Sequence, residues 1–228
     1  MQGKNVLISG GAGGLGLGVT PLVLAQGGQV TIPYRQENRL APLKTRLSPE
    51  DFAKIRFVKT DLTQESAVAQ LIQDLGRVDV LIHLTGGFNM GPTPEFSLGD
   101  WRALFTLNLE TTFLLCKYCL PGMLANNYGR IVTVGSKGAR EPGAQLAGYC
   151  AAKAGVIALT QAIAAETKGT NVTANTVLPS VIDTPTNRDS MGAGDWVSAE
   201  SLGQVICFLA SEAAGDLRGA AIPVYGNL

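Results

Sequence analysis

Residues 6–16 read VLISGGAGGLG, a short apolar run followed at once by a cluster of glycines. From Leu15 to Ala25 the apolar residues then recur at helical spacing. A strand, a glycine turn and a helix in this order place free backbone N–H groups at the start of the helix, where they can bind a phosphate group. Glycines also occur in plain flexible turns, so the argument depends on the position of this cluster between the first strand and the first helix.

The rest of the chain repeats the pattern of a short apolar strand followed by a helix. Further strands are expected at Val30–Ile32, Ile55–Val58, Val78–Leu84, Arg130–Val134, Val172–Leu178 and Ala221–Tyr225. Further helices are expected at Trp101–Asn126, Tyr149–Thr167 and Ser201–Ala210. Pro33 removes a hydrogen-bond donor, and we expect it to mark where the second strand stops pairing. The alternation predicts an α/β fold, a single-domain Rossmann-like doubly wound parallel sheet of about seven strands with helices on both faces.

The composition limits the class of protein. With 228 residues we expect one domain, residues 1–228. Lys plus Arg and Asp plus Glu each number 18, so the net charge is zero and nothing indicates a nucleic-acid partner. The sequence shows neither a signal peptide nor an apolar run of membrane-spanning length. We therefore expect a cytoplasmic, reduced protein with no membrane partner.

Four cysteines and one histidine give little basis for a metal site or a histidine-based catalytic centre. Cys116 and Cys119 form a C-x-x-C, but the motif lies inside an apolar helical pattern and has no second copy. We interpret the pair as two small residues on a buried helix face and expect no metal. His83 lies in a strand pattern, where a hydrogen-bonded core histidine is favoured over a catalytic one.

Tyr149 and Lys153 are four residues apart, which puts them on one face of a helix. A lysine cation near a phenol favours the phenolate and should lower the pKa of Tyr149 towards the range of an acid/base. A surface Tyr–Lys pair is the alternative. Ser136 follows the fifth strand, 13 residues before Tyr149, where it can hydrogen-bond a substrate oxygen. Asn108 lies among apolar residues and needs a buried partner, either a water or a backbone group.

Taken in order, these residues resemble the classical short-chain dehydrogenase/reductase family over nearly the whole chain. Ser9–Gly16 is similar to the family's T-G-x-x-x-G-x-G turn, with Ser in place of the first Thr. The resemblance implies that the acid/base tyrosine belongs to a catalytic tetrad, Asn108, Ser136, Tyr149 and Lys153. It implies cofactor-binding roles for Gly10, Gly14, Leu15, Gly16, Arg35, Asp61, Leu62, Thr85, Gly86, Tyr149, Lys153, Pro179, Val181 and Thr184. In the family the aspartate holds the adenine, the lysine holds the nicotinamide ribose, and the asparagine positions a water that relays protons.

Two stretches depart from the family pattern. The family's Asn-Asn-Ala-Gly after the fourth strand is here His83-Leu84-Thr85-Gly86, and we expect His83 to brace the sheet in place of the first Asn. The family's Pro-Gly after the sixth strand is here Pro179-Ser180.

The end of the second strand decides between NAD and NADP. An acidic residue there would bind the ribose 2′-hydroxyl of NAD, but the chain has Tyr34-Arg35. Arg35 can bind a 2′-phosphate, which favours NADP over NAD. An exposed arginine without a ligand is the alternative, because Glu37 is close by.

The resemblance implies an oxidoreductase that transfers a hydride between NADP(H) or NAD(H) and a small carbonyl or alcohol substrate. It further implies a homo-oligomer, a tetramer or a dimer, that pairs through the two long helices. A substrate lid is expected at about residues 185–197, with Gly192 and Gly194 as flexible points. The alternative is a catalytically idle dinucleotide-binding or sensing protein of the same fold. The presence of Ser136, Tyr149 and Lys153 together argues against that alternative.

Overall fold

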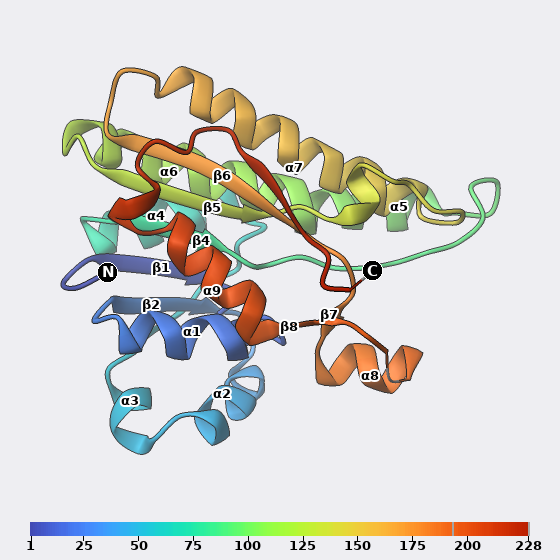
Figure 1. The fold of residues 1–228 in the computed structure, drawn as a ribbon, viewed down its shortest axis with the longest axis horizontal. Coiled ribbons are helices and arrows are strands. Elements are labelled where there is room, and N and C mark those ends of the chain that lie inside the picture. The colour runs from blue at the N-terminus through green and yellow to red at the C-terminus, as the bar shows by residue number, and fades with distance from the viewer. Residues whose placement is uncertain (193, 228) are drawn as a thin grey trace.

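The described part of the chain forms one parallel sheet of seven strands in the order β3-β2-β1-β4-β5-β6-β9 (Figure 1). The computed structural model describes residues 1–192 and 194–227, so Ala193 of the predicted lid lies outside the described residues. The strands are β1 (Asn5–Ser9), β2 (Gln29–Tyr34), β3 (Arg56–Lys59), β4 (Val80–His83), β5 (Gly129–Val134), β6 (Val172–Pro179) and β9 (Ala221–Val224). The predicted fold class and strand order along the chain are therefore confirmed.

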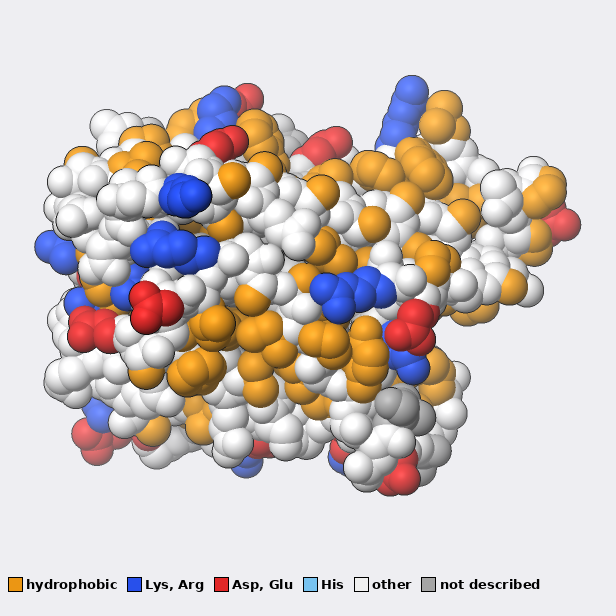
Figure 2. Space-filling model, turned by 45° about the horizontal axis from the view of Figure 1, so that its top comes forward, with side chains coloured by type: hydrophobic (Ala, Val, Ile, Leu, Met, Phe, Trp, Pro, Cys, Tyr) orange, Lys and Arg blue, Asp and Glu red, His pale blue; other side chains and the backbone are white. Residues whose placement is uncertain are grey.

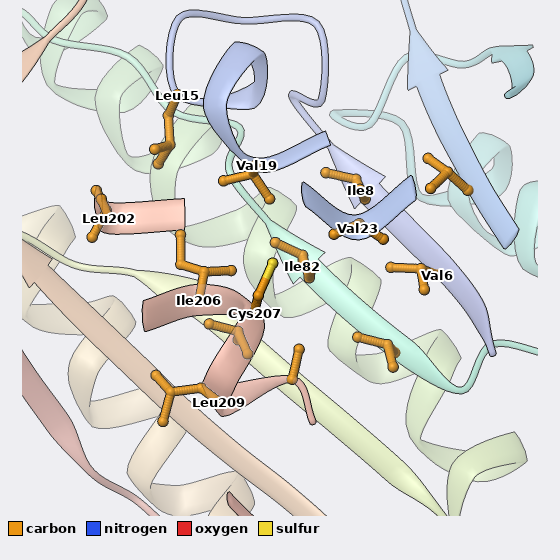
Figure 3. Packing of buried hydrophobic residues seen from close by; sticks show 14 of the residues in the cluster. Val6, Ile8, Leu15, Val19, Val23, Ile82, Leu202, Ile206, Cys207 and Leu209 are labelled. Atoms are coloured by element: carbon orange, nitrogen blue, oxygen red, sulfur yellow. The ribbon is translucent and has the colours of Figure 1, made fainter. Parts of the chain in front are cut away.

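Helices cover both faces of the sheet (Figure 1). One face packs against α1 (Gly16–Ala25) and α9 (Ala199–Leu209), and the other against α4 (Glu65–Leu75), α6 (Thr111–Ala125) and α7 (Ala147–Glu166). Successive residues of a strand point to opposite faces. Val6 and Ile8 accordingly join the apolar cluster under α1 and α9 shown in Figure 3, whereas Leu7 joins the cluster under α4 and α6. Two buried cores explain why strands such as β1 and β4 carry apolar residues on both faces.

The predicted helix Trp101–Asn126 is interrupted in the structure. It consists of α5 (Leu98–Phe105), a π-helical segment (Thr106–Glu110) and α6. Within the interruption, the N–H of Thr111 bonds to the carbonyl of Thr106, five residues back. The hydroxyls of Thr111 and Thr112 bond to the carbonyls of Leu107 and Asn108, at 2.8 and 2.7 Å. Such π-helical turns often occur at functional sites, and this one carries Asn108.

Several elements were not predicted from the sequence. Helix α4 crosses between β3 and β4, and two short helices, α2 (Ala41–Arg46) and α3 (Pro49–Ala53), follow β2. After β6, the two-residue strands β7 (Ile182–Asp183) and β8 (Val197–Ser198) pair with each other on either side of α8 (Pro185–Met191). The predicted lid therefore begins with a helix, and the two short strands that flank that helix pair with each other.

Pro33 marks the end of pairing on one side of β2 only. The pairing of β2 with β1 ends at Thr31, opposite Leu7. On the other side, the pairing with β3 includes Pro33 and continues to Tyr34. The expectation that the strand stops pairing at Pro33 is thus wrong for the β3 side, because only one edge of β2 loses the proline donor.

Helix α7 is long and apolar enough to cross a membrane by length and composition alone, with 20 residues and a mean hydropathy of 1.2. The sequence expectation that no segment reaches this length is wrong by that measure. The helix is weak evidence for a membrane span, because the core helix of a folded domain passes the same test. In this structure α7 packs against β5 and β6, and 44% of its apolar window is buried.

Candidate functional site

In the glycine turn between β1 and α1, a side chain in place of either Gly10 or Gly16 would clash with nearby backbone. Gly10 has φ of +69°, a conformation that L residues rarely adopt, and a Cβ built on it would lie 2.9 Å from the backbone nitrogen of Thr85. A Cβ on Gly16 would lie 2.4 Å from the carbonyl carbon of Gly11. The turn therefore brings its backbone close to the loop after β4 and leaves its outer side open.

A cleft of about 540 Å³ opens over this turn. It is bounded by the turn itself, the end of β2, the loops after β3 and β4, and the start of α8. Many of the predicted cofactor-binding residues line it, namely Gly10, Gly14, Leu15, Arg35, Asp61, Leu62, Thr85 and Gly86. Its volume lies within the range of small-molecule sites. The open glycine turn, a pair of cations at one end and a carboxylate fit a nicotinamide dinucleotide.

The cations and the carboxylate lie at the β2–β3 end of the cleft. Oδ1 of Asp61 accepts hydrogen bonds from the hydroxyl and the N–H of Thr63, at 2.8 and 3.0 Å. These bonds lower the pKa of Asp61, and the positive charge of Arg35 adds to the effect. Arg39, on the short 3₁₀ helix after β2, also lines the cleft and was not among the predicted residues. The signal for it is a second arginine four residues after Arg35.

At the other end of the cleft, Gly86 brings two residues of the predicted tetrad together. A Cβ built on Gly86 would lie 2.8 Å from Oδ1 of Asn108 and 3.3 Å from Nζ of Lys153. Nζ of Lys153 donates to the carbonyl of Val134 at 2.9 Å. The lysine side chain is buried, and burial lowers its pKa to about 8. At pH 7 most Lys153 side chains are therefore still protonated, but they lose the proton more readily than an exposed lysine does.

Asn108 bonds to backbone groups. The residue is buried, and its Nδ2 donates to the carbonyls of Gly87 and Leu104, at 3.0 and 2.9 Å. Its Oδ1 accepts from the N–H of Gly87 at 3.2 Å. Of the two partners that the sequence left open, the structure shows the backbone. The side chain fixes the loop after β4 and has both amide protons engaged.

Ser136 and Tyr149 come from the end of β5 and the first turn of α7. Oγ of Ser136 accepts from the N–H of Gly138 at 3.1 Å. Burial raises the pKa of Tyr149, and the nearby Ser136 hydroxyl acts in the opposite direction. The expectation that Lys153 lowers this pKa is wrong for the described structure, because the phenol is buried and the ammonium group bonds to Val134 instead.

The predicted cofactor-binding residues near the end of β6 and after it do not all lie at the cleft. Thr184 is buried, accepts from the N–H of Asn187 at the start of α8, and has its methyl group 2.8 Å from a Cβ built on Gly14. Thr184, the residue just before the predicted lid, therefore lies against the glycine turn. Neither Pro179 nor Val181 lines the cleft. Pro179 ends β6 opposite Val224, and the carbonyl of Val181 accepts from the N–H of Val197.

His83 is a core residue with both ring nitrogens in contact with hydroxyls. Nδ1 lies 2.7 Å from Oγ of Ser9, and Nε2 lies 3.3 Å from Oγ1 of Thr111. Burial, with a smaller effect of the Lys153 charge, lowers the pKa of His83 to about 3, so the ring is neutral. The predicted core histidine is confirmed, and it joins β1, β4 and α6. Cys116 and Cys119 are likewise free and buried in the core, and burial raises the pKa of Cys116 to about 12.

Comparison with protein families matches residues 4–193 to the short chain dehydrogenase family. D-beta-hydroxybutyrate dehydrogenase of Cupriavidus necator is 27% identical over 96% of this chain and 95% of its own. D-threitol dehydrogenase of Mycolicibacterium smegmatis is 27% identical over 100% of this chain and 93% of its own. 2,3-Dihydroxy-2,3-dihydro-p-cumate dehydrogenase of Pseudomonas putida is 32% identical over 81% of this chain and 73% of its own.

Solved structures resemble this one over its whole length. A short-chain type dehydrogenase/reductase from Mycobacterium ulcerans has a TM-score of 0.91 at 26% identity, covering 99% of this chain and 90% of its own. ElxO with NADP bound has a TM-score of 0.91 at 26% identity, covering 99% and 98%.

Proposed function

Because this chain belongs to the short-chain dehydrogenase family and is an NAD(P)-dependent oxidoreductase, we propose that it moves a hydride between NADP(H) and a small carbonyl or alcohol substrate, with Tyr149 as the acid/base. The observation that carries the proposal is the meeting of Asn108 and Lys153 at Gly86, on the rim of the cleft. Tyr149 lies one helical turn before Lys153 on α7. An acid/base and a cation are thus held beside the cofactor cleft.

The proposed reaction divides the work between the cofactor and the chain. When bound, the nicotinamide supplies or accepts the hydride. Tyr149 gives a proton to the carbonyl oxygen during reduction and takes it back during oxidation. Its raised pKa suits the first task, because the phenol stays protonated at neutral pH. Oγ of Ser136 accepts from Gly138, which leaves the hydroxyl proton of Ser136 to be donated to the substrate oxygen when the substrate binds.

Lys153 and Asn108 position the cofactor ribose, the loop after β4 and a water. Lys153 has three N–H donors, of which one bonds to Val134, so two remain for the ribose hydroxyls next to the nicotinamide. Asn108 holds the loop after β4 through Gly87, and one lone pair of its Oδ1 remains for a water.

Two arginines at the adenine end of the cleft support the preference for NADP. Arg35 and Arg39 both line it, and β2 ends at Tyr34 without an acidic residue. A guanidinium binds a phosphate through paired N–H groups, whereas the 2′-hydroxyl of NAD needs an acceptor. We expect NADPH to bind more tightly than NADH in a fluorescence titration. Equal affinities would count against this preference.

The substrate belongs to the class of small carbonyl compounds or alcohols. The relatives' names denote a hydroxybutyrate, a threitol and a dihydrodiol, and each contains an alcohol group. The test is a screen for hydride transfer with each cofactor against panels of ketones, aldehydes and alcohols, followed at the absorbance of the reduced nicotinamide. Turnover supports the proposal. Saturable NADPH binding without any turnover would favour a sensing protein.

Assembly, location and the lid complete the proposal. Leu98 and Trp101 on α5 and Phe113 on α6 are exposed by 61, 37 and 48%, which supports a homo-oligomer, tetramer or dimer, that pairs over these helices. Light scattering that finds a monomer at micromolar concentration would contradict it.

Free, buried cysteines support a reducing, cytoplasmic location. Residues 185–197 act as the lid, with Gly192 and Gly194 as its flexible points, and the pairing of β7 with β8 holds its base.

A further inference from the structure

The loop between β4 and α5 carries an aromatic ring to the proposed acid/base. This segment, residues 86–97, runs out from the end of the sheet and returns to α5 (Figure 1). The ring of Phe88 lies 5.1 Å from the ring of Tyr149, centroid to centroid, at an interplanar angle of 70°. This is an edge-to-face contact. Phe88 nevertheless stays 61% exposed, so the contact leaves most of the ring open to solvent.

The position of this ring is held by the fold on both sides. Gly87, directly before it, exchanges two hydrogen bonds with the side chain of Asn108. Three residues after it, the N–H of Gly91 bonds to the carbonyl of Gln145 at 2.9 Å. Gln145 lies just before α7, the helix that carries Tyr149. Phe88 is therefore fixed relative to Tyr149.

The surface that Phe88 presents is apolar. The segment Gly86–Pro94 contains no charged residue. It has two polar side chains, Asn89 and Thr93, and that of Asn89 donates to Asp100 and accepts from the N–H of Met90. Met90 is 52% exposed, and hydrophobic side chains are visible on the projecting end of the molecule in Figure 2. From Gly86 to Pro94 the loop offers no charge to a substrate group, and its one acid, the exposed Glu95, follows that stretch. An apolar substrate group would cover the exposed ring of Phe88.

We propose that Phe88 is a specificity residue that packs against a flat apolar substituent on the reacting carbon, so that the preferred substrates are aryl ketones and aldehydes or the matching alcohols. This inference rests on the proposed function. In the reduction, the hydride of NADPH forms the new C–H bond and the carbonyl π pair moves to the oxygen. That oxygen takes the proton of Tyr149, and the products are the aryl alcohol and NADP⁺. The substituent lies along Phe88 while the oxygen faces Tyr149 and Ser136.

The first test compares two ketones that differ only in this substituent, acetophenone and butanone. We expect wild-type KM to be about tenfold lower for acetophenone, which is the scale of one aromatic contact with its buried area. Phe88→Ala should raise the KM for acetophenone about tenfold and change that for butanone by less than about twofold. Phe88→Leu, which keeps apolar volume, should recover part of the loss. Phe208→Ala removes a comparably exposed phenylalanine, 48% exposed on α9, and serves as the matched control.

A binding measurement separates this inference from the proposed function. Calorimetric titrations of 1-phenylethanol and 2-butanol into the NADPH-loaded protein involve no turnover, because the alcohol and the cofactor are both reduced. Tighter binding of 1-phenylethanol by the wild type that disappears in Phe88→Ala, with NADPH affinity unchanged, supports the inference even if neither ketone is reduced. An equal preference in Phe88→Ala and wild type, or no preference in the wild type, would overturn it. Turnover of both ketones without such a preference would leave hydride transfer standing and remove the role of Phe88.

Discussion

His83 should make the protein sensitive to mild acid, and His83→Asn should remove most of that sensitivity. His83 is the sole histidine of the chain, so no other imidazole titrates in the same range. It is fully buried between the hydroxyls of Ser9 and Thr111, and burial lowers its pKa from 6.5 to about 3. In the unfolded chain the ring returns to its ordinary pKa.

The sign and size of the effect come from these two pKa values. Because the folded-state pKa is lower, the unfolded chain binds more protons between pH 6.5 and 3, and stability is lost as the pH falls through that range. Above pH 6.5 the ring is neutral in both states and contributes no pH dependence. Between pH 7.5 and pH 5 the linkage relation gives a loss of about 2 kcal/mol in the free energy of unfolding. Most carboxyl groups titrate at lower pH, so this interval belongs mainly to His83.

Urea unfolding followed by far-UV circular dichroism at pH 7.5, 6 and 5 measures the effect at constant protein concentration. His83→Asn retains a hydrogen-bonding side chain but cannot take up a proton, so its free energy of unfolding should fall by less than about 0.5 kcal/mol over the interval. A wild-type free energy that stays flat to pH 5 would refute the reasoning, as would an equally steep fall in His83→Asn.

Two substitutions in the cleft give further predictions. Arg35→Ala should weaken NADPH binding about ten- to hundredfold, the scale of a lost charge-assisted contact, and should change NADH binding by less than about twofold in the same fluorescence titration. Similar losses for both cofactors would show that Arg35 does not contact the 2′-phosphate. Gly86→Ala should fold but lower kcat at least about tenfold, because its Cβ would press on Asn108 and Lys153, which hydrogen bonds hold in place. Gly122→Ala on α6, where a Cβ meets no atom within 4 Å, is its control, and equal kcat in the two variants would contradict the importance of this contact.

The sheet could be predicted from the sequence because its central strands, such as β4 and β6, are buried along their whole length and most strands contain a short apolar run. Helix α4 was missed even though Val68 and Leu71 are at helical spacing and pack into the core, because no cap or glycine marks its start. The break at Thr106–Glu110 was also missed. It depends on threonine hydroxyls that bond back to the helix and on the asparagine that bonds to a distant loop, and neither is visible in apolar spacing.

Part of the predicted site could be located from the sequence, but its electrostatics could not. The order of motifs led to Gly86, Asn108 and Lys153, which the structure brings together. The direction of the pKa shift of Tyr149 was wrong, because spacing along a helix gives proximity to a lysine and says nothing about burial. Phe88 was missed for a related reason, since its contact with Tyr149 depends on the path of a loop between two elements.

The role of Tyr149 as acid/base is tested most directly by the turnover of Tyr149→Phe on a carbonyl substrate identified in the screen. The substitution removes one hydroxyl and keeps the ring that contacts Phe88, so folding and NADPH affinity should match those of the wild type. We predict that kcat falls by about two orders of magnitude or more, the usual contribution of a positioned acid/base. A variant that binds NADPH normally and retains near wild-type kcat would contradict the assignment, and the proton would then have to come from Ser136 or a bound water.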